Sequence, residues 1–446
     1  MGLFSSNSFS GGIHPPEHKD LTRHKAIERC PTPPLVVIPV QQHIGAPSEP
    51  IVEKGNQVRA GDPISESKGF VSVPAHTSIS GTVAAVENRP HPNGSSVLSV
   101  VVERDEETDE PEPDDTLDAD YADLDKREMI KRIQAAGLAG MGGATFPTHV
   151  KLSPPPDKQI DTLILNGAEC EPYLTSDHRL MLEEPEKILR GMEIIIKILG
   201  AKVGAVGIEN NKSDAVKALQ KKAAELNLPY KVYSLYVKYP QGAEKQLIKA
   251  VTNRRVPAGG LPMDVGCVVQ NVGTAAAIYD AVAYQKPLTR RVVTVTGSGI
   301  SEPKNLDVPI GTPFSFVFEQ CGGLKEQAGK VIMGGPMMGL AQPNVEAPVI
   351  KGTSGLLVLN ERESKRKEEQ TCISCAHCVD VCPMGLMPKV LGQLVRNERF
   401  DEAEVYHVLD CIECGSCAFV CPSHINLVHL IKYGKLKVIQ KQKKAS

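Results

Sequence analysis

Eight of the twelve cysteines of this chain lie in two short runs near its C-terminus. The first run begins at Cys372 and reads C-I-S-C-A-H-C-V-D-V-C-P, and the second begins at Cys411 and reads C-I-E-C-G-S-C-A-F-V-C-P. Both have the spacing C-x2-C-x2-C-x3-C-P, which lets closely spaced thiolates wrap around a cubane of iron and sulfide. The chemistry that this spacing predicts is the transfer of single electrons.

A doubled run of this kind is the signature of bacterial two-cluster ferredoxins, where each [4Fe–4S] cluster takes three thiolates from one run and the fourth from the other. The two expected ligand sets are Cys372, Cys375, Cys378 with Cys421, and Cys411, Cys414, Cys417 with Cys382. Structural zinc usually takes only four ligands, from two C-x2-C pairs, and fits eight cysteines poorly. Disulfides are typical of secreted chains, and no signal peptide is recognisable here.

The remaining cysteines are expected to be ordinary buried thiols of a protein in a reducing compartment. They are Cys30, Cys170, Cys267 and Cys321. Cys170 differs from the others because it lies inside a motif that is described below.

The overall composition describes a folded protein of several domains. A length of 446 residues suggests roughly three domains, and the hydrophobic content of 41% is enough for large cores. No apolar run approaches the ~18 uncharged residues of a membrane-spanning helix. Work at a membrane would therefore go through partners, and no nucleic-acid partner is expected.

Two segments at the N-terminal end differ in character. Residues 1–34 are rich in Pro, Gly and His, which predicts an arm or loop in which His14 and His18 are surface residues. From Leu35 to Glu103, short apolar runs alternate with Gly and Pro turns, which indicates an all-β domain. This domain resembles the flattened β-barrel of biotinyl and lipoyl carriers. Lys68 lies near their modified lysine but lacks their flanking residues, so a structural or docking domain is expected.

Charge is distributed unevenly along the chain. The segment Glu103–Asp125 holds thirteen acids and one base, and it is predicted to be a linker with too little apolar content to pack. The last sixteen residues hold six lysines and no acid. This basic tail could rest on an anionic membrane face or an acidic partner, or it could be a frayed terminus.

A glycine cluster follows the linker. Residues 126–136 have helical spacing, and the next segment contains Gly137, Gly140, Gly142 and Gly143. Such a cluster lets backbone N–H groups approach a phosphate or a flavin, although a tight turn is the simpler explanation. An expected buried strand at 162–165 then ends in N-G-A-E-C-E-P-Y, and helix-like and strand-like segments alternate to about Ala250. This order predicts a parallel sheet with polar residues at its carboxyl edge.

Four motifs in this region occur in a distinctive order. They are G-M-G-G-A-T-F-P-T-H-V-K at 140–151, N-G-A-E-C-E-P at 166–172, Y-P-Q-G-A-E-K at 239–245 and V-V-Q-N-V-G-T at 268–274. They resemble the flavin and NADH motifs of the flavin-bearing subunit of respiratory complex I. The next segment, from Val292 to Phe318, resembles the small β-grasp domain (SLBB) that follows in that subunit.

The whole order of segments resembles one family, the RnfC subunits of the Rnf (Rsx) electron transport complex, an ion-translocating NAD–ferredoxin oxidoreductase. The resemblance implies a multidomain fold of α+β and α/β parts. The implied domains are an arm and barrel-sandwich domain at 1–103, an acidic linker at 104–125, a Rossmann-like α/β FMN and NAD domain at 126–285, an SLBB domain at 286–355, and a helical two-cluster ferredoxin domain with the basic tail at 356–446.

Site residues follow from the same resemblance, position by position. It implies that the FMN phosphate and ring are lined by Gly140, Gly142, Gly143 and Lys151. Asn166 and Asn271 would hydrogen-bond the flavin or its ribityl chain, with Thr274 nearby. Phe146 would stack on the adenine of NAD(H), and the floor under the nicotinamide would be shaped by Glu169, Glu171 and Glu244. Complex I has an Asp where this chain has Ala168, and a second aromatic that falls near Pro154.

The resemblance implies a peripheral subunit at the cytoplasmic face of the bacterial plasma membrane. It would exchange hydride with NAD(H) at non-covalent FMN and pass single electrons through two [4Fe–4S] clusters. The implied partners are the membrane subunits and the ferredoxin-type B subunit of the complex. Two alternatives remain open from the residues: a microcompartment cobalamin reductase, which shares flavin, SLBB and ferredoxin parts, and a cluster-bearing docking scaffold without flavin turnover.

Overall fold

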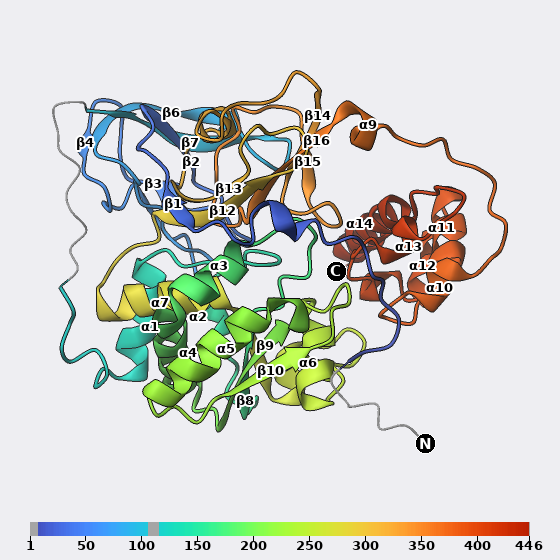
Figure 1. The fold of residues 1–446 in the computed structure, drawn as a ribbon, viewed down its shortest axis with the longest axis horizontal. Coiled ribbons are helices and arrows are strands. Elements are labelled where there is room, and N and C mark those ends of the chain that lie inside the picture. Colours follow the sequence, from blue (N-terminus) through green and yellow to red (C-terminus); the bar gives the residue numbers. More distant parts are fainter. Residues whose placement is uncertain (1–7, 106–115, 446) are drawn as a thin grey trace.

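The computed structural model describes residues 8–105 and 116–445. Its chain forms a barrel-like β domain, a parallel α/β domain, a second mixed sheet and a helical C-terminal domain (Figure 1). This confirms the predicted fold class of α+β and α/β parts.

The N-terminal β domain is built on two small sheets. One has the order β2-β7-β6-β4 and the other pairs β3 with β5. Residues that alternate along β2 and β7, such as Val36, Ile38, Val100 and Val102, are fully buried and fill the space between the sheets. The strands are β2 (Leu35–Pro39), β3 (Glu49–Pro50), β4 (Gln57–Val58), β5 (Ser65–Glu66), β6 (Gly81–Pro90) and β7 (Ser96–Arg104).

The α/β domain has a four-stranded parallel sheet in the order β10-β9-β8-β11. The strands are β8 (Thr162–Asn166), β9 (Val203–Glu209), β10 (Lys231–Leu235) and β11 (Cys267–Asn271). The helices are α1 (Lys126–Ala135), α2 (Thr148–Lys151), α3 (Ser176–Glu183), α4 (Pro185–Leu199), α5 (Ser213–Glu225), α6 (Glu244–Thr252) and α7 (Val272–Ala283).

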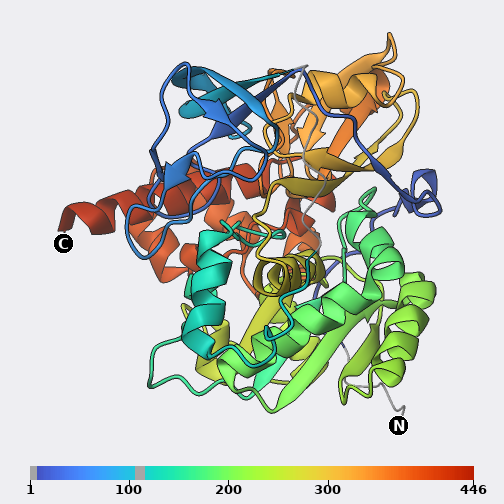
Figure 2. The same ribbon diagram turned by 90° about the vertical axis from the view of Figure 1, so that its left-hand side faces the viewer.

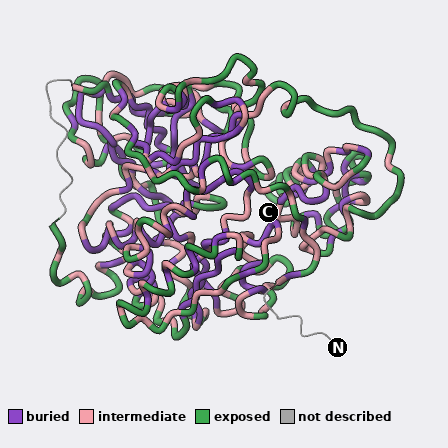
Figure 3. Tube along the Cα trace, viewed as in Figure 1, coloured by how far each residue is buried: buried purple, intermediate pink, exposed green. Residues whose placement is uncertain are grey.

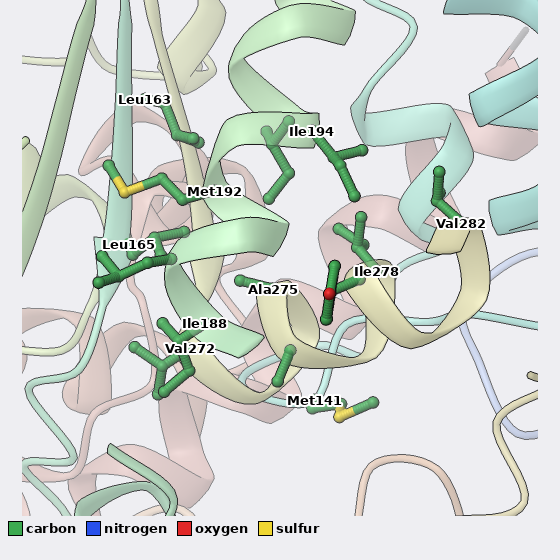
Figure 4. Close-up of a cluster of buried hydrophobic side chains, with 14 of the residues drawn as sticks. Met141, Leu163, Leu165, Ile188, Met192, Ile194, Val272, Ala275, Ile278 and Val282 are labelled. Atoms are coloured by element: carbon green, nitrogen blue, oxygen red, sulfur yellow. The ribbon is translucent and has the colours of Figure 1, made fainter. Parts of the chain in front are cut away.

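Both faces of this sheet are covered by helices. In β8, Leu163 and Leu165 point to the core shared with α4 and α7, whereas Ile164 points to the smaller core under α6. Figure 4 shows the larger core. Gly191 lets α4 and α7 cross closely, because a Cβ at this position would lie 1.8 Å from the carbonyl oxygen of Ala275.

The second mixed sheet has six strands in the order β1-β13-β12-β16-β14-β15. Its strands are β1 (Ile27–Arg29), β12 (Arg290–Thr296), β13 (Lys304–Pro309), β14 (Ala328–Met333), β15 (Leu340–Gln342) and β16 (Gly355–Asn360), and α8 (Phe314–Glu319) packs on it. Two features differ from the predicted domain limits. The N-terminal arm contributes β1, and β16 continues the sheet five residues beyond position 355.

The C-terminal domain is helical and follows a long exposed connection after β16 (Figure 3). Its helices are α9 (Glu361–Ser364), α10 (His377–Asp380), α11 (Pro388–Arg396), α12 (Phe400–Val405), α13 (Ser416–Phe419) and α14 (Leu427–Ala445). The chain also has single 3-10 turns, η1 (Lys19–Leu21), η2 (Asn210–Lys212), η3 (Pro262–Val265) and η4 (Val408–Asp410).

Both charged segments contain ordered structure, although the acidic segment was predicted not to pack. The end of the acidic segment packs, since Tyr121 and Leu124 contact the core of the α/β domain and Asp118 pairs with Arg132 at 2.7 Å. Residues 106–115 of that linker lie outside the described residues. The basic tail is not frayed: it forms helix α14, which projects from the body of the molecule (Figure 2) and is tied to it by the ion pair of Lys435 with Glu413.

Candidate functional site

Two asparagines mark the carboxyl edge of the parallel sheet. Asn166 ends β8 and Asn271 ends β11, and the register of the two strands places them side by side. The carboxyl edge of such a sheet is where ligands bind in open α/β folds, because the connecting loops there surround a crevice. The structure therefore brings these two predicted residues together at the expected place.

The glycine loop is fixed over the same edge by backbone bonds. Its two sides meet where the N–H of Gly140 donates to the carbonyl of Phe146 at 2.8 Å. The N–H of Met141 donates to the hydroxyl of Thr274 at 2.9 Å, which ties the loop to the first turn of α7. Buried Arg291 donates to the carbonyl of Met141 at 3.2 Å. These bonds hold the base of the loop and leave its tip exposed.

The tip of the loop has room for a bound group. Gly143 has a left-handed backbone with φ of +71°, and a Cβ placed there would meet no atom within 4 Å. At Gly142 an added Cβ would lie 3.3 Å from the amide nitrogen of Asn271. A glycine backbone beside open space is what a flavin phosphate or ring needs in order to approach main-chain N–H groups. The loop thus fits the predicted FMN.

Lys151 and Glu244 form an ion pair at the side of this edge. The ammonium of Lys151, at the end of α2, lies 2.6 Å from a carboxylate oxygen of Glu244, at the start of α6. Asn166 donates from its side chain to the carbonyl of Gly242 at 2.9 Å, just before α6. An ammonium has three hydrogens, so Lys151 keeps donors for a phosphate while Glu244 orients it.

Asp177 is a half-buried acid that the sequence did not predict. Its carboxylate accepts a hydrogen bond of 2.7 Å from the side chain of Asn271, whose oxygen caps α7 by accepting from the N–H of Gly273 at 2.7 Å. Burial, together with the charge of Glu169, raises the pKa of Asp177 to about 7. The side chain of Asn271 is therefore held in one orientation, with one amide hydrogen left for a ligand.

The three predicted glutamates do not form one floor. Glu169 accepts from the N–H groups of Asp177 at 2.7 Å and His178 at 3.2 Å, at the start of α3. Glu171 turns away to the loop between β14 and β15 and accepts from the N–H of Met338 at 2.9 Å. Its burial raises the pKa of Glu171 to about 7. These two carboxylates have structural roles in the fold, because each accepts hydrogen bonds from backbone N–H groups of a different element.

The eight run cysteines meet in two groups. Cys372, Cys375, Cys378 and Cys421 line a cavity of about 480 Å³, and Cys382, Cys411, Cys414 and Cys417 line a much smaller one. We call these the outer set and the inner set. Each takes three thiols from one run and one from the other, which is the arrangement that a pair of [4Fe–4S] clusters requires. Cys375 of the outer set is exposed, whereas Cys414 and Cys417 of the inner set are buried.

The inner set lies against the α/β domain. The phenol of Tyr239 donates to the carbonyl of Cys414 at 2.8 Å, and Met337 packs in the same small core. Cys170 belongs to this core too, and its sulfur accepts from the N–H of Gly242 at 3.2 Å. Burial raises the pKa of Cys170, which marks an unreactive thiol. We call the loop at residues 166–174, which contains Cys170, the flavin-side loop. This loop and the inner set therefore share one packed interface.

Models of four protein families match the chain in sequence. A RnfC barrel sandwich hybrid domain matches residues 7–107, a Nuo51 FMN-binding domain matches 133–280, an SLBB domain matches 292–341 and a 4Fe-4S dicluster domain matches 364–435. With the site geometry, these matches define a flavin and iron–sulfur oxidoreductase subunit with two [4Fe–4S] clusters and FMN.

Whole-length relatives identify the family. The chain is 47% identical to the C subunit of the "Na(+)-translocating ferredoxin:NAD(+) oxidoreductase complex" of Acetobacterium woodii, covering 98% of this chain and 99% of that protein. It is 49% identical to the C subunit of the "Proton-translocating" complex of Clostridium ljungdahlii, over 96% and 93%. It is 42% identical to the C subunit of the "Ion-translocating oxidoreductase complex" of Rhodobacter capsulatus, over 98% and 84%. The chain belongs to the RnfC family of these complexes, as the motifs predicted.

These relatives give no support to the two alternatives, a cobalamin reductase or a docking scaffold. The relatives are named as C subunits of oxidoreductase complexes. Within residues 8–105 and 116–445, the structure has no helix that is long and apolar enough to cross a membrane.

Proposed function

We propose that this chain is the subunit through which an ion-translocating ferredoxin:NAD oxidoreductase exchanges electrons with NAD(H). The observation that carries the proposal is the shared interface between the carboxyl edge of the parallel sheet and the inner cysteine set, bridged by Tyr239 and Cys414. When FMN is bound, it can accept a hydride and release electrons singly. The residues of this chain bind and orient FMN and NAD(H), and they connect the flavin site with the inner cysteine set.

At the flavin side, backbone and amide groups do most of the binding. The tip at Gly142 and Gly143 leaves room for the cofactor, and Lys151 supplies a positive charge for its phosphate. Asn271, held by Asp177, offers a fixed donor. Phe146 is half-buried at the end of the glycine loop and is assigned to the adenine of NAD(H). No side chain has to act as a strong acid or base, because the flavin carries the hydride chemistry.

The positions of the two cysteine sets suggest the order in which electrons pass between the flavin and the partner subunits. The inner set packs on the flavin-side loop, and the outer set includes exposed Cys375. We assign the inner set to exchange with the flavin and the outer set to exchange with partner subunits. The partners that we propose are the membrane subunits and the ferredoxin-type B subunit of the complex, at the cytoplasmic face of the membrane.

The test uses the full chain purified without oxygen. We expect about eight irons, one non-covalent FMN, and oxidation of NADH with ferricyanide as acceptor. Protein with iron but without flavin would overturn the proposal in favour of a scaffold. Protein with FMN but without NADH oxidation would show that Ala168 and Pro154, which replace complex I residues, have changed the nucleotide site.

A further inference from the structure

The N-terminal arm reaches the flavin-side loop with three consecutive residues. The carbonyl of Glu17 accepts a hydrogen bond of 2.8 Å from the N–H of Tyr173. The ring of His18 stacks on the ring of Tyr173, with centroids 4.6 Å apart and planes inclined by 15°. The ammonium of Lys19 enters behind the loop. These contacts join segments that are more than 150 residues apart in the sequence.

Lys19 uses all of its donors on this loop. Its ammonium donates to the carbonyls of Glu169 at 2.9 Å, Glu171 at 2.9 Å and Leu174 at 2.6 Å. An ammonium has three hydrogens, so one side chain satisfies three carbonyls at once. Lys19 is only 4% exposed. Burying a charge is costly unless it is well bonded, so the three bonds explain why the side chain lies inside the protein.

The loop needs such support because its backbone is strained. Glu169 has φ of 43° and Tyr173 has φ of 70°, and both are left-handed positions that residues other than glycine rarely adopt. A second buried lysine acts on the same loop, since Lys212 donates to the carbonyl of Ala168 at 2.7 Å. Two ammonium groups thus hold the backbone between Asn166 and Leu174 from behind.

The same arm also touches the inner cysteine set. The N–H of Gly12 donates to the carbonyl of Val381 at 2.8 Å, next to Cys382. Ile13 and Tyr239 exchange two backbone hydrogen bonds of 2.8 Å. The arm therefore runs along the interface where the flavin-side loop meets the iron–sulfur domain, and Lys19 is its anchor on the flavin side.

We propose that Lys19 is a positioning residue for the flavin and NADH site, which holds the loop 166–174 in its strained shape by capping three carbonyls. This inference rests on the proposed function. Removing the ammonium leaves three carbonyls without a donor, and the loop can then relax out of its left-handed turns. Asn166 and its neighbours would shift, and a misplacement of about 1 Å in a site can cost about 100-fold in rate. The clusters, which are held by their own thiolates, would stay.

The experiment compares three variants of the full chain purified without oxygen. Lys19→Met keeps the length of the side chain and removes the charge and the donors. Lys19→Arg keeps charge and donors. Lys25→Met is the matched control, because Lys25 is an exposed lysine of the same arm that donates to the carbonyl of Pro303 at 2.7 Å. Each protein is assayed for iron, for FMN affinity by titration of flavin-depleted protein, and for kcat and KM with NADH and ferricyanide.

We expect Lys19→Met to keep about eight irons while FMN affinity and kcat/KM for NADH fall by about tenfold or more, the scale set by a misplaced site. Lys19→Arg should recover a large part of this loss, and Lys25→Met should match the wild type. Unchanged FMN affinity and unchanged KM in Lys19→Met would overturn the proposal. So would equal losses in Lys19→Met and Lys25→Met.

A second variant covers the case in which Lys19→Met does not fold. Lys19→Gln retains two N–H donors, and a fall in its FMN affinity below that of the wild type supports the proposal, whereas wild-type FMN affinity and KM overturn it. Failure of the proposed function gives a different result, because the wild-type protein itself would then lack FMN or NADH oxidation.

Discussion

The phenol of Tyr239 and the carbonyl of Cys414 are joined by a hydrogen bond of 2.8 Å, 175 residues apart in the sequence. Tyr239 is 2% exposed and begins one of the four flavin-domain motifs, and Cys414 belongs to the inner cysteine set. The α/β domain and the iron–sulfur domain therefore meet through a directed contact, and the inner set lies on the flavin side of the C-terminal domain.

Tyr239→Phe should slow electron transfer between the flavin and the inner cluster without removing either. The ring remains to fill its space, but the carbonyl of Cys414 loses a buried donor, at a cost of about 1–3 kcal/mol. Stopped-flow absorbance should show the flavin reduced by NADH at the wild-type rate and the clusters reduced severalfold more slowly. Tyr236→Phe, at a side chain that is 57% exposed, is the control. Equal rates of cluster reduction in both variants would argue against a role of this hydrogen bond in electron transfer.

Gly143→Val should lose FMN and keep its iron. A valine there would occupy the open space at the tip of the glycine loop and would also strain a backbone with φ of +71°. Gly94→Val separates the two effects, because Gly94 has φ of +87°, equally open surroundings and a place in the turn between β6 and β7. We expect Gly94→Val to be less stable but to bind FMN. Full FMN content in Gly143→Val would place the flavin elsewhere.

The doubled ferredoxin signature predicted the two cysteine sets, and the structure brings the thiols of each set to one space. The sheet edge was also predictable, since Asn166 and Asn271 each end a short apolar strand. The sequence did not predict which way the side chains of Glu169 and Glu171 point. Both lie within one motif, yet each carboxylate is drawn to backbone donors of a different element.

Asp177 and Lys19 were missed for a related reason. Nothing in the local sequence shows that Asp177 meets Asn271 or that Lys19 reaches Leu174, because these contacts span 94 and 155 residues. A buried charge is visible only once the tertiary fold is known. The end of the acidic segment was misjudged because charge content alone hides the few apolar residues, such as Tyr121 and Leu124, that pack.

Phe146→Ala should keep FMN and weaken NADH binding. Stacking of an aromatic side chain on a base contributes about 1–3 kcal/mol, which corresponds to a loss of roughly 5- to 150-fold in affinity. Titration of the protein with NADH or with a non-reducing analogue measures the dissociation constant directly, and flavin absorbance measures FMN content. An unchanged dissociation constant would remove Phe146 from the nucleotide site.

Cys382→Ser should cost the inner cluster alone. Because Cys382 is the fourth ligand of the set formed with Cys411, Cys414 and Cys417, the iron content should fall from about eight to about four. Cys321→Ala, at a buried thiol in the core of the second mixed sheet, should keep about eight irons. Loss of both clusters in Cys382→Ser, with the outer set intact in sequence, would contradict the division into an inner and an outer set.

Lys351 joins three domains and should make stability depend on pH. Its ammonium, which is 2% exposed, donates to the carbonyls of Pro74 at 2.8 Å and Gly137 at 2.6 Å. Burial lowers its pKa from 10.5 to about 7. Between these two values the unfolded chain binds more protons than the folded chain, so the contribution of Lys351 to the free energy of unfolding rises with pH from about 7 to about 10 and is flat below 7.

Lys351→Met removes this contribution, because methionine does not titrate. The difference in Tm, variant minus wild type, should therefore become smaller or more negative as the pH is raised from 7 to 10, whatever its sign at pH 7. Val349→Ala is the control: it leaves a buried cavity two residues away and has no proton to exchange, so its difference in Tm should stay constant. Differential scanning calorimetry at both pH values makes the comparison. A constant difference for Lys351→Met would mean that the ammonium keeps its proton throughout this range, because its two carbonyl bonds outweigh the cost of burial.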